Sequence, residues 1–293
     1  MLIRSYITLG TVSMPDYFFN KIITQIFLIF FLTLPTLATE KVEINRLYQA
    51  LNLKGLFQEL QEEGIIAGTE MLKDGGQSQQ SQAWVITLKE IYAAESLEEF
   101  FKSELLKLSV AEKMVNAINF YETPLGKKLI KDELITRRAL KNEDKKIQAK
   151  KILNQLKYFK PNRLKLYQKI IEENNYIEDN VSSSMNSNLA FYQGYSLSLP
   201  SDKQGLLEAE IISKIWKNES ETRERMTEWV LGFTAFTFKD LTSKELNLYL
   251  EFSESTSGKL LNNSINYILD KAFENQSYKL GRAFAILSEQ GGA

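Results

Sequence analysis

Carboxylates are the side chains of this sequence whose type and spacing come nearest to a catalytic arrangement. Two carboxyl groups held roughly 5–10 Å apart can cleave a glycosidic bond, one as acid and the other as base or nucleophile. The candidate glutamates are Glu62, Glu63, Glu98, Glu99, Glu122 and Glu254. They could act as the pairs Glu62 with Glu63, Glu98 with Glu99, or Glu122 with Glu254. Glutamate on a helix surface is usually just solvated, and nothing in the sequence marks one of these pairs as catalytic. The sequence therefore assigns no catalytic residue.

The 293 residues include neither His nor Cys, and this absence excludes several kinds of active site. Ser-His-Asp and Cys-His nucleophiles, an imidazole general base, His-ligated haem and zinc sites built on His or Cys all need one of these side chains. The motifs S-x-x-K, G-x-x-x-x-G-K-[ST] and G-x-G-x-x-G do not occur. We expect no metal and no cofactor, and a binding protein is favoured over an enzyme.

A basic segment from Lys127 to Lys165 is the second candidate for function. It carries 14 Lys and Arg against 4 Asp and Glu, while the whole chain has a formal net charge of −1. Such asymmetry favours an anionic partner, either a lipid surface or an acidic polysaccharide. The residues expected to bind it are Lys145, Lys146, Lys150 and Lys151. Nucleic acid is not expected, because no aromatic residues are interleaved with the charges for base stacking.

The alternative for this segment is structural. Apolar residues recur along it at Ile130, Leu134, Leu140, Ile147, Ile152 and Leu156. One long helix would account for the pattern without any partner, with this stripe against the core and its Lys-rich face either packed against acidic neighbours or solvated.

Helices must position these residues, because apolar side chains recur at helical spacing and alternating strand-like runs are absent. The aromatic residues, including Trp84 and Trp216, follow the same spacing. Three of them, Phe233, Phe236 and Phe238, lie beside Trp229 and are predicted to belong to the core. A cavity for an apolar ligand between helices is the alternative for such a cluster. The sequence therefore predicts an all-α helical bundle.

The stretch NFYETPLGKK, residues 119–128, predicts a tight corner between two helices. A capping box formed by Ser109 and Glu112 would open the first helix. Thr123 would cap the second helix, with Pro124 in its first turn, where the missing N–H costs nothing. Gly126 would allow the neighbouring helix to approach closely.

A second stretch, EFSESTSGKL at residues 251–260, repeats this pattern 132 positions later. The matched residues are Phe120 and Phe252, Glu122 and Glu254, Thr123 and Ser255, Gly126 and Gly258, and Lys127 and Lys259. A second capping box, Thr242 with Glu245, precedes this copy. Farther upstream, the sequence RLYQ at residues 46–49 is echoed by KLYQ at residues 165–168. These echoes predict two related multi-helix repeats, residues 39–160 and 161–293.

The pattern F-Y-x-[ST]-P-x-G-K-K resembles a bacterial exported family described as a domain of unknown function, number two-thousand-and-fifty-nine. The residues that carry the resemblance in the first copy are Phe120, Tyr121, Thr123, Pro124, Gly126, Lys127 and Lys128. The second copy departs from the pattern at Ser253, Thr256 and Leu260. The resemblance covers residues 97–140 and, less fully, residues 233–272. It implies an exported helical domain and no particular activity.

The N-terminal segment predicts export. Lys21 precedes a short apolar block at residues 22–34, and Ala38 provides a small residue for cleavage. This arrangement is typical of a secretory signal peptide, here residues 1–38, with Met14 as an alternative start. A transmembrane anchor is the alternative, but it needs about 20 consecutive apolar residues. We expect Gram-negative type export, to the periplasm or out of the cell, and a mature form that is not transmembrane.

The sequence thus favours a non-catalytic binding or interaction module of the cell envelope, whose partner is a protein or another envelope component. One alternative is a carboxylate-dependent hydrolase of envelope polymers. A pocket holding two carboxyl groups with raised pKa values would favour this enzyme. The other alternative is a protein that docks on anionic membranes through the basic segment.

Overall fold

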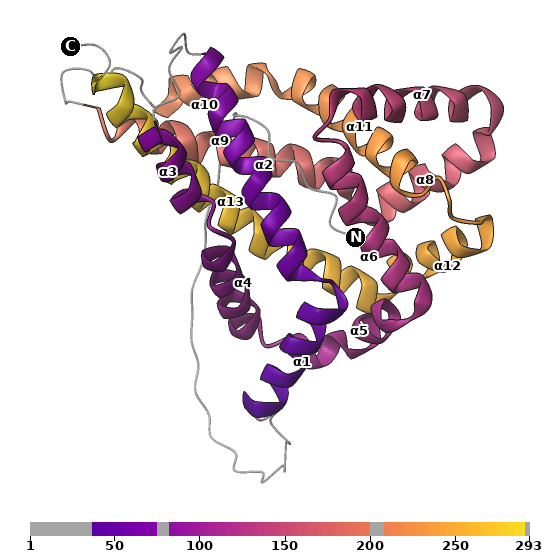
Figure 1. Cartoon of the computed structure of the whole chain (residues 1–293). Helices are drawn as coiled ribbons and strands as arrows, with labels where there is room; N and C mark the ends of the chain where they lie inside the picture. The colour runs from indigo at the N-terminus through magenta and orange to yellow at the C-terminus, as the bar shows by residue number, and fades with distance from the viewer. Residues whose placement is uncertain (1–36, 75–81, 200–207, 291–293) are drawn as a thin grey trace, which may run out of the picture.

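The structure, a computed structural model, describes residues 37–74, 82–199 and 208–290. Within these ranges every regular element is a helix and no strand occurs, so the prediction of an all-α fold is confirmed (Figure 1). The predicted signal peptide lies outside the described residues except for its last two positions, which begin the first helix.

The first group of helices runs from the N-terminal side to the first corner motif and past it. It comprises α1 (Leu37–Ala50), α2 (Leu53–Asp74), α3 (Gln82–Ile91), α4 (Ala94–Leu108), the short 3₁₀ helix η1 (Ala111–Met114), α5 (Val115–Glu122) and α6 (Pro124–Ala139). A separate helix follows, α7 (Glu143–Phe159). The second group comprises α8 (Pro161–Glu173), α9 (Tyr176–Ser196), α10 (Glu208–Lys217), α11 (Glu219–Thr237), α12 (Ser243–Glu254) and α13 (Thr256–Gln290).

Helix contacts follow the same order in the two groups. In the first group α1 contacts α2, α4 and α5, and in the second α8 contacts α9, α11 and α12. Likewise α2 contacts α3, α4 and α6, as α9 contacts α10, α11 and α13. The turns after α1 and after α8 each contain an asparagine with positive φ, 46° at Asn52 and 55° at Asn175. Asparagine is one of the few residues that readily adopts this left-handed conformation. Helix α7 contacts α8 and α11 and has no counterpart among the described helices.

Two main cores lie between these helices. The first includes Leu47, Phe57 and Phe101 of the first group together with Ile268 and Phe273 of α13. The second is formed by α6, α7, α8, α11 and α12. Helix α13 runs diagonally across the molecule and therefore completes the first core from the far end of the sequence (Figure 1).

The predicted capping box at Ser109 and Glu112 is wrong. Ser109 ends α4 in the left-handed conformation, with φ of 51°, and its side chain caps no helix. The free N–H of Ala111 instead donates to the carboxylate of Glu40, a buried residue of α1, at 2.9 Å. A side chain 71 residues away thus satisfies a backbone N–H of the turn that Ser109 was predicted to cap.

The basic segment is not one long helix. Asn142 caps α7 by accepting from the Lys145 N–H at 3.3 Å, and Pro161 occupies the first turn of α8. The segment is therefore divided among α6, α7 and α8. Ile147, expected in the buried stripe, is 67% exposed, and the face of α7 that packs against the core carries Ala149, Leu153 and Leu156.

Candidate functional site

The two corner motifs adopt the same local structure. The Thr123 hydroxyl accepts from the Gly126 N–H at 3.1 Å, and the Ser255 hydroxyl accepts from the Gly258 N–H at 3.0 Å. A Cβ at Gly126 would lie 2.3 Å from the Phe120 carbonyl oxygen, because each second helix starts directly against the end of the helix before it. The expected capping by Thr123 and the close approach at Gly126 are both confirmed.

The two corners also lie against each other. The rings of Phe120 and Phe252 stack at 3.9 Å between centroids with an interplanar angle of 2°. Tyr121 packs edge-on against Phe252 and is 1% exposed. The lysines of the two motifs point to the surface, where Lys259 pairs with Glu173 at 3.1 Å. The aromatic residues of the two corners therefore hold α5 and α12 together.

Beneath the corners lies a buried polar cluster that sequence reasoning missed. The hydroxyls of Tyr176 and Tyr249 are 2.7 Å apart, and Tyr121 hydrogen-bonds to Tyr249. Burial raises the pKa of all three phenols well above the usual value, with the carboxylate of Glu133 adding to the effect. The three tyrosines are therefore neutral near neutral pH and act there as hydrogen-bonding groups.

Four of the six candidate catalytic carboxylates, Glu62, Glu63, Glu98 and Glu122, are held in ion pairs. Glu62 pairs with Lys141 at 2.6 Å, and Glu122 pairs with Arg46 at 2.8 Å. Hydrogen bonds from Lys102 and Tyr48 hold the pKa of Glu98 below its usual value, and the neighbouring Glu99 and the corner residue Glu254 are exposed. A carboxyl group that must donate a proton near neutral pH needs a raised pKa instead.

Two carboxyl groups do have a raised pKa, but they do not form a pair. Burial raises the pKa of Glu63, whose nearest cation is Arg137 at 3.3 Å. Burial also raises the pKa of Glu274, where the nearby charge of Asp270 contributes. The two groups share no partner and line none of the cavities described here, and the described residues hold no cluster of three or more metal-ligating side chains. The geometry gives no support to a carboxylate-dependent hydrolase.

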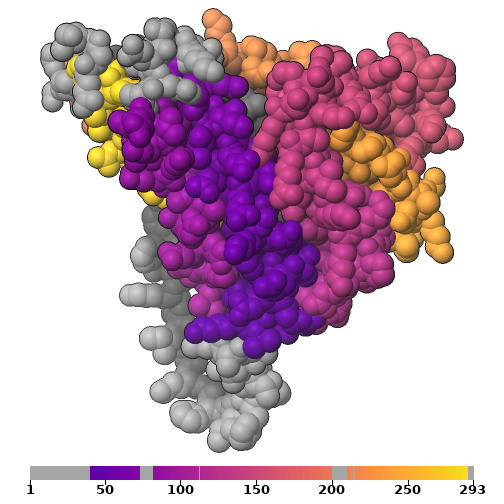
Figure 2. All heavy atoms as spheres, in the orientation of Figure 1, coloured from indigo at the N-terminus to yellow at the C-terminus, as the bar shows by residue number. Residues whose placement is uncertain are grey.

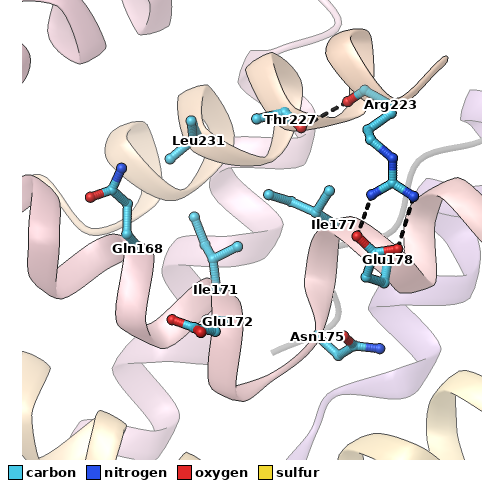
Figure 3. A pocket seen from close by; sticks show the side chains of 9 residues that line it. All are labelled: Gln168, Ile171, Glu172, Asn175, Ile177, Glu178, Arg223, Thr227 and Leu231. Atoms are coloured by element: carbon cyan, nitrogen blue, oxygen red, sulfur yellow. Dashed lines mark hydrogen bonds and ion pairs between the residues drawn. The ribbon is translucent and has the colours of Figure 1, made fainter. Parts of the chain in front are cut away.

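A cavity of about 390 Å³ lies between α8, α9 and α11 (Figure 3). Ile171, Ile177 and Leu231 point towards one another across it. Its cation, Arg223, is held by two carboxylates, with Glu178 in contact through both guanidinium NH groups and Glu219 at 2.8 Å. The charge of Arg223 is therefore already compensated, and apart from Arg223 and Glu178 the charged residue that lines the apolar cavity is Glu172.

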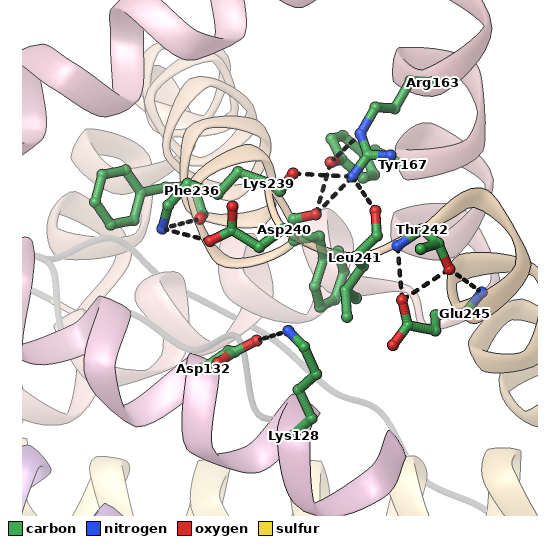
Figure 4. A network of polar contacts seen from close by, with 11 residues as sticks. Lys128, Asp132, Arg163, Tyr167, Phe236, Lys239, Asp240, Leu241, Thr242 and Glu245 are labelled. Carbon is green, nitrogen blue, oxygen red and sulfur yellow. Dashed lines mark hydrogen bonds and ion pairs between the residues drawn. The ribbon is translucent and has the colours of Figure 1, made fainter. Parts of the chain in front are cut away.

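Several cations of the basic segment serve the fold. Arg163 donates to the carbonyl oxygens of Phe238 and Leu241 at 2.7 Å each and so caps the end of α11 (Figure 4). Beside it the predicted capping box of Thr242 and Glu245 is present. Four other cations of the segment, Lys128, Arg137, Arg138 and Lys141, each pair with a carboxylate that is at most 23% exposed. These pairs belong to the packing of α6 and are less free to exchange than fully exposed pairs.

The four predicted docking lysines all lie on α7 and are exposed. Lys146 pairs with Glu143 at 2.5 Å and Lys150 with Glu228 at 2.7 Å, both in solvent-exposed pairs. Lys145 donates to Gln148 at 3.1 Å. Exposed ion pairs contribute little to stability, so these ammonium groups can exchange their partners readily.

Apolar side chains accompany these lysines on what we call the outer face of α7, formed by Ile147, Lys151, Asn154, Tyr158 and the adjoining Phe159. The exposed fractions are 67% for Ile147, 81% for Tyr158 and 79% for Phe159. These residues line a shallow hollow of about 400 Å³. Helices α7 and α8 form a projecting corner of the molecule (Figures 1 and 2). The charge of the basic segment singled out this region in the sequence. Which apolar stripe of α7 is exposed, however, is decided by the packing of the other stripe against α11.

The aromatic residues singled out in the sequence differ in burial. Phe233, Phe236 and Phe238 are buried, as expected, whereas Trp216 is 55% exposed. Trp229 is partly buried and packs against Phe233, with ring centroids 5.1 Å apart.

None of the helices in the described residues is long and apolar enough to cross a bilayer. Comparisons with family models, with curated proteins and with solved structures give no match to this chain. The resemblance carried by the corner motif therefore stays a prediction.

Proposed function

We propose that the protein is an exported, non-catalytic binding module of the cell envelope that docks on anionic lipid surfaces through the outer face of α7. The single observation that carries this proposal is the exposure of Ile147, Tyr158 and Phe159 beside Lys150 and Lys151 on one helix. Large apolar side chains are costly to leave in water, and a helix with such a face flanked by lysines suits the membrane interface.

The energies fit a reversible interaction. Each Lys or Arg near an anionic bilayer contributes about 1 kcal/mol, and tyrosine is favoured at the level of the lipid headgroups. Ile147 and Phe159 would add apolar burial, at roughly 25 cal/mol for each Å² removed from water. An acidic polysaccharide, the alternative anionic partner, would use the lysines but gain little from the exposed isoleucine and phenylalanine.

The export part of this proposal rests on the leader-like N-terminal sequence and on the resemblance of the corner motif to an exported family. We also propose that the chain contains two copies of one helical unit. The matching corners, the matching asparagine turns and the parallel order of helix contacts support this view. Under this proposal α7 is the helix added between the copies, which is where a separate binding surface can arise without altering the repeated packing.

The proposal can be tested by co-sedimentation of the mature protein with vesicles. We expect binding to vesicles rich in phosphatidylglycerol, weak binding to phosphatidylcholine alone, and a loss of affinity as salt rises from 0.05 to 0.5 M because exposed charges are screened. Changing Lys145, Lys146, Lys150 and Lys151 to Gln removes four contributions of about 1 kcal/mol and should weaken binding by up to about 1,000-fold. Changing Tyr158 and Phe159 to Ser should also weaken it.

Matched controls separate the outer face from charge and hydrophobicity in general. Lys89, Lys113, Lys217 and Lys244 are exposed lysines of other helices or turns, and Ile86 is a half-exposed isoleucine of α3. Converting these lysines to Gln, or Ile86 to Ser, should change vesicle binding much less. Equal losses in the control and α7 variants, or binding that is indifferent to salt, would refute docking through α7.

A further inference from the structure

A groove between α7 and α11 lies directly beside the outer face of α7. It has a volume of about 290 Å³ and is lined by both helices and by Leu140. The apolar part of its wall is formed by Leu140, Ala149, Leu153, Trp229 and Phe233. A groove of this size is at the small end of the range of ligand pockets, so it suits a slender ligand rather than a large ring system.

Gly232 makes this groove possible. It lies in the interior of α11, where glycine is less favourable than alanine by about the largest margin of any residue except proline. No backbone strain or close contact requires glycine here, because a Cβ built at this position would meet no atom within 4 Å. The space beside Gly232 is therefore open, and a larger side chain would fill it.

The rim of the groove is basic. Lys146, Lys150 and Arg225 line it, against one carboxylate, Glu228. Arg225 pairs with Glu221 at 2.7 Å, and both of these side chains are exposed, as are those of the Lys150–Glu228 pair. Since exposed pairs are readily exchanged, the three cations can turn towards an anion at the mouth of the groove.

We propose that the α7–α11 groove binds one hydrocarbon chain of an anionic amphiphile, with the chain along Trp229, Phe233 and Gly232 and the anionic head at Lys146, Lys150 and Arg225. This inference rests on the proposed docking on lipid surfaces and deepens it, because it names the part of a lipid that the protein takes up. Apolar walls bury the chain and the basic rim selects the sign of the head group.

The groove can be tested with soluble amphiphiles, using Trp229 as reporter. In a Trp216→Phe background the remaining tryptophans are Trp229 and the buried Trp84, which is 3% exposed. Dodecyl phosphate below its critical micelle concentration should change the Trp229 emission and saturate at one equivalent. Dodecanol, dodecyltrimethylammonium and inorganic phosphate, which each lack the anionic head or the chain, should bind at least 10-fold more weakly.

Two substitutions at one position give the matched control. Gly232→Leu should fill the groove and weaken dodecyl phosphate binding at least 10-fold, whereas Gly232→Ala should keep most of the affinity. Gly232→Ala should not unfold at a lower temperature than the parent protein, because a Cβ there meets no atom within 4 Å. Circular dichroism shows whether Gly232→Leu is folded. Full affinity in a folded Gly232→Leu protein, or equal binding of dodecanol and dodecyl phosphate, would overturn the groove assignment.

Vesicles distinguish this inference from the function on which it rests. The outer face of α7 is intact in Gly232→Leu, so this variant should still sediment with phosphatidylglycerol vesicles. Vesicle binding without any dodecyl phosphate binding refutes the groove alone. Dodecyl phosphate binding by a protein that ignores vesicles refutes docking through the outer face alone.

Discussion

At the scale of single residues, the surroundings of a helical glycine decide whether its replacement by alanine stabilises or destabilises the protein. A Cβ at Gly126 would lie 2.3 Å from the Phe120 carbonyl oxygen and 2.4 Å from the Cα of Tyr121. Backbone atoms cannot move aside cheaply, so Gly126→Ala should destabilise the protein by about 1–3 kcal/mol despite the better helix propensity of alanine. Urea unfolding of this variant checks the prediction, and an unchanged midpoint would contradict the tight corner.

Gly232 should give the opposite result. Its position is helical and a Cβ there meets nothing within 4 Å. Gly232→Ala should therefore stabilise the protein by about 0.5–1 kcal/mol, the usual difference in helix propensity. The same urea experiment measures both glycine variants, and a loss of stability at Gly232 would mean that its surroundings are closed.

The two corner caps should be worth similar amounts. Thr123 and Ser255 each accept from a glycine N–H and have nearly the same backbone angles. Replacing either by Ala should cost about 1 kcal/mol in the free energy of unfolding. Thr123→Ser, which keeps the hydroxyl, serves as the control and should lose little.

Residue patterns in the sequence predicted the corners because all their partners are local. The Thr123 hydroxyl binds the N–H of Gly126, three residues later, and the capping box likewise joins Thr242 to Glu245. The prediction for Ser109 was wrong because this residue ends α4, and the nearby Ala111 N–H is bound by the side chain of Glu40 on another helix. The open space at Gly232 was equally out of reach, since a glycine in a helical pattern says nothing about the side chains across the groove.

At the scale of elements, the tyrosine cluster joins α5, α9 and α12. Burial raises the pKa of Tyr121, Tyr176 and Tyr249 well above that of an unfolded tyrosine, which is about 10. Their contribution to stability is therefore complete below pH 10 and is lost as pH rises from there through the raised values of the folded state.

This prediction is measured by urea unfolding between pH 8 and pH 11. The free energy of unfolding should fall above pH 10, and phenolate absorbance from the three tyrosines should appear only as the protein unfolds. In Tyr249→Phe the fall with pH should be less steep, because one titrating group is gone. Early phenolate absorbance from the folded protein, beyond that of the exposed tyrosines, would contradict the burial of the cluster.

Elements were predictable in kind but not always in extent. Helical periodicity correctly gave an all-α protein, yet the basic segment was divided into three helices at Asn142 and Pro161. Helix α7 carries apolar residues on two faces, and periodicity alone cannot say that Leu153 is buried while Tyr158 is 81% exposed. That choice is made by α11, which covers one face and leaves the other open.

At the scale of the whole molecule, the proposed export makes a direct prediction. Mass spectrometry of the protein recovered from the envelope of its own cells should find Thr39 as the first residue. A retained leader would contradict the predicted cleavage after Ala38 and favour a membrane anchor instead. The N-terminal segment lies outside the described residues, so its role rests on the sequence alone.

The position of α13 has a consequence for the order of events during synthesis. Its residues Leu261, Ile265, Ile268 and Phe273 are part of the core of α1, α2, α4 and α5. The first helices to leave the ribosome thus lack their packing partner until the final described helix is made. Under the proposed export the chain would cross a membrane unfolded, and a packing partner made this late would delay formation of the first core until translation is nearly complete.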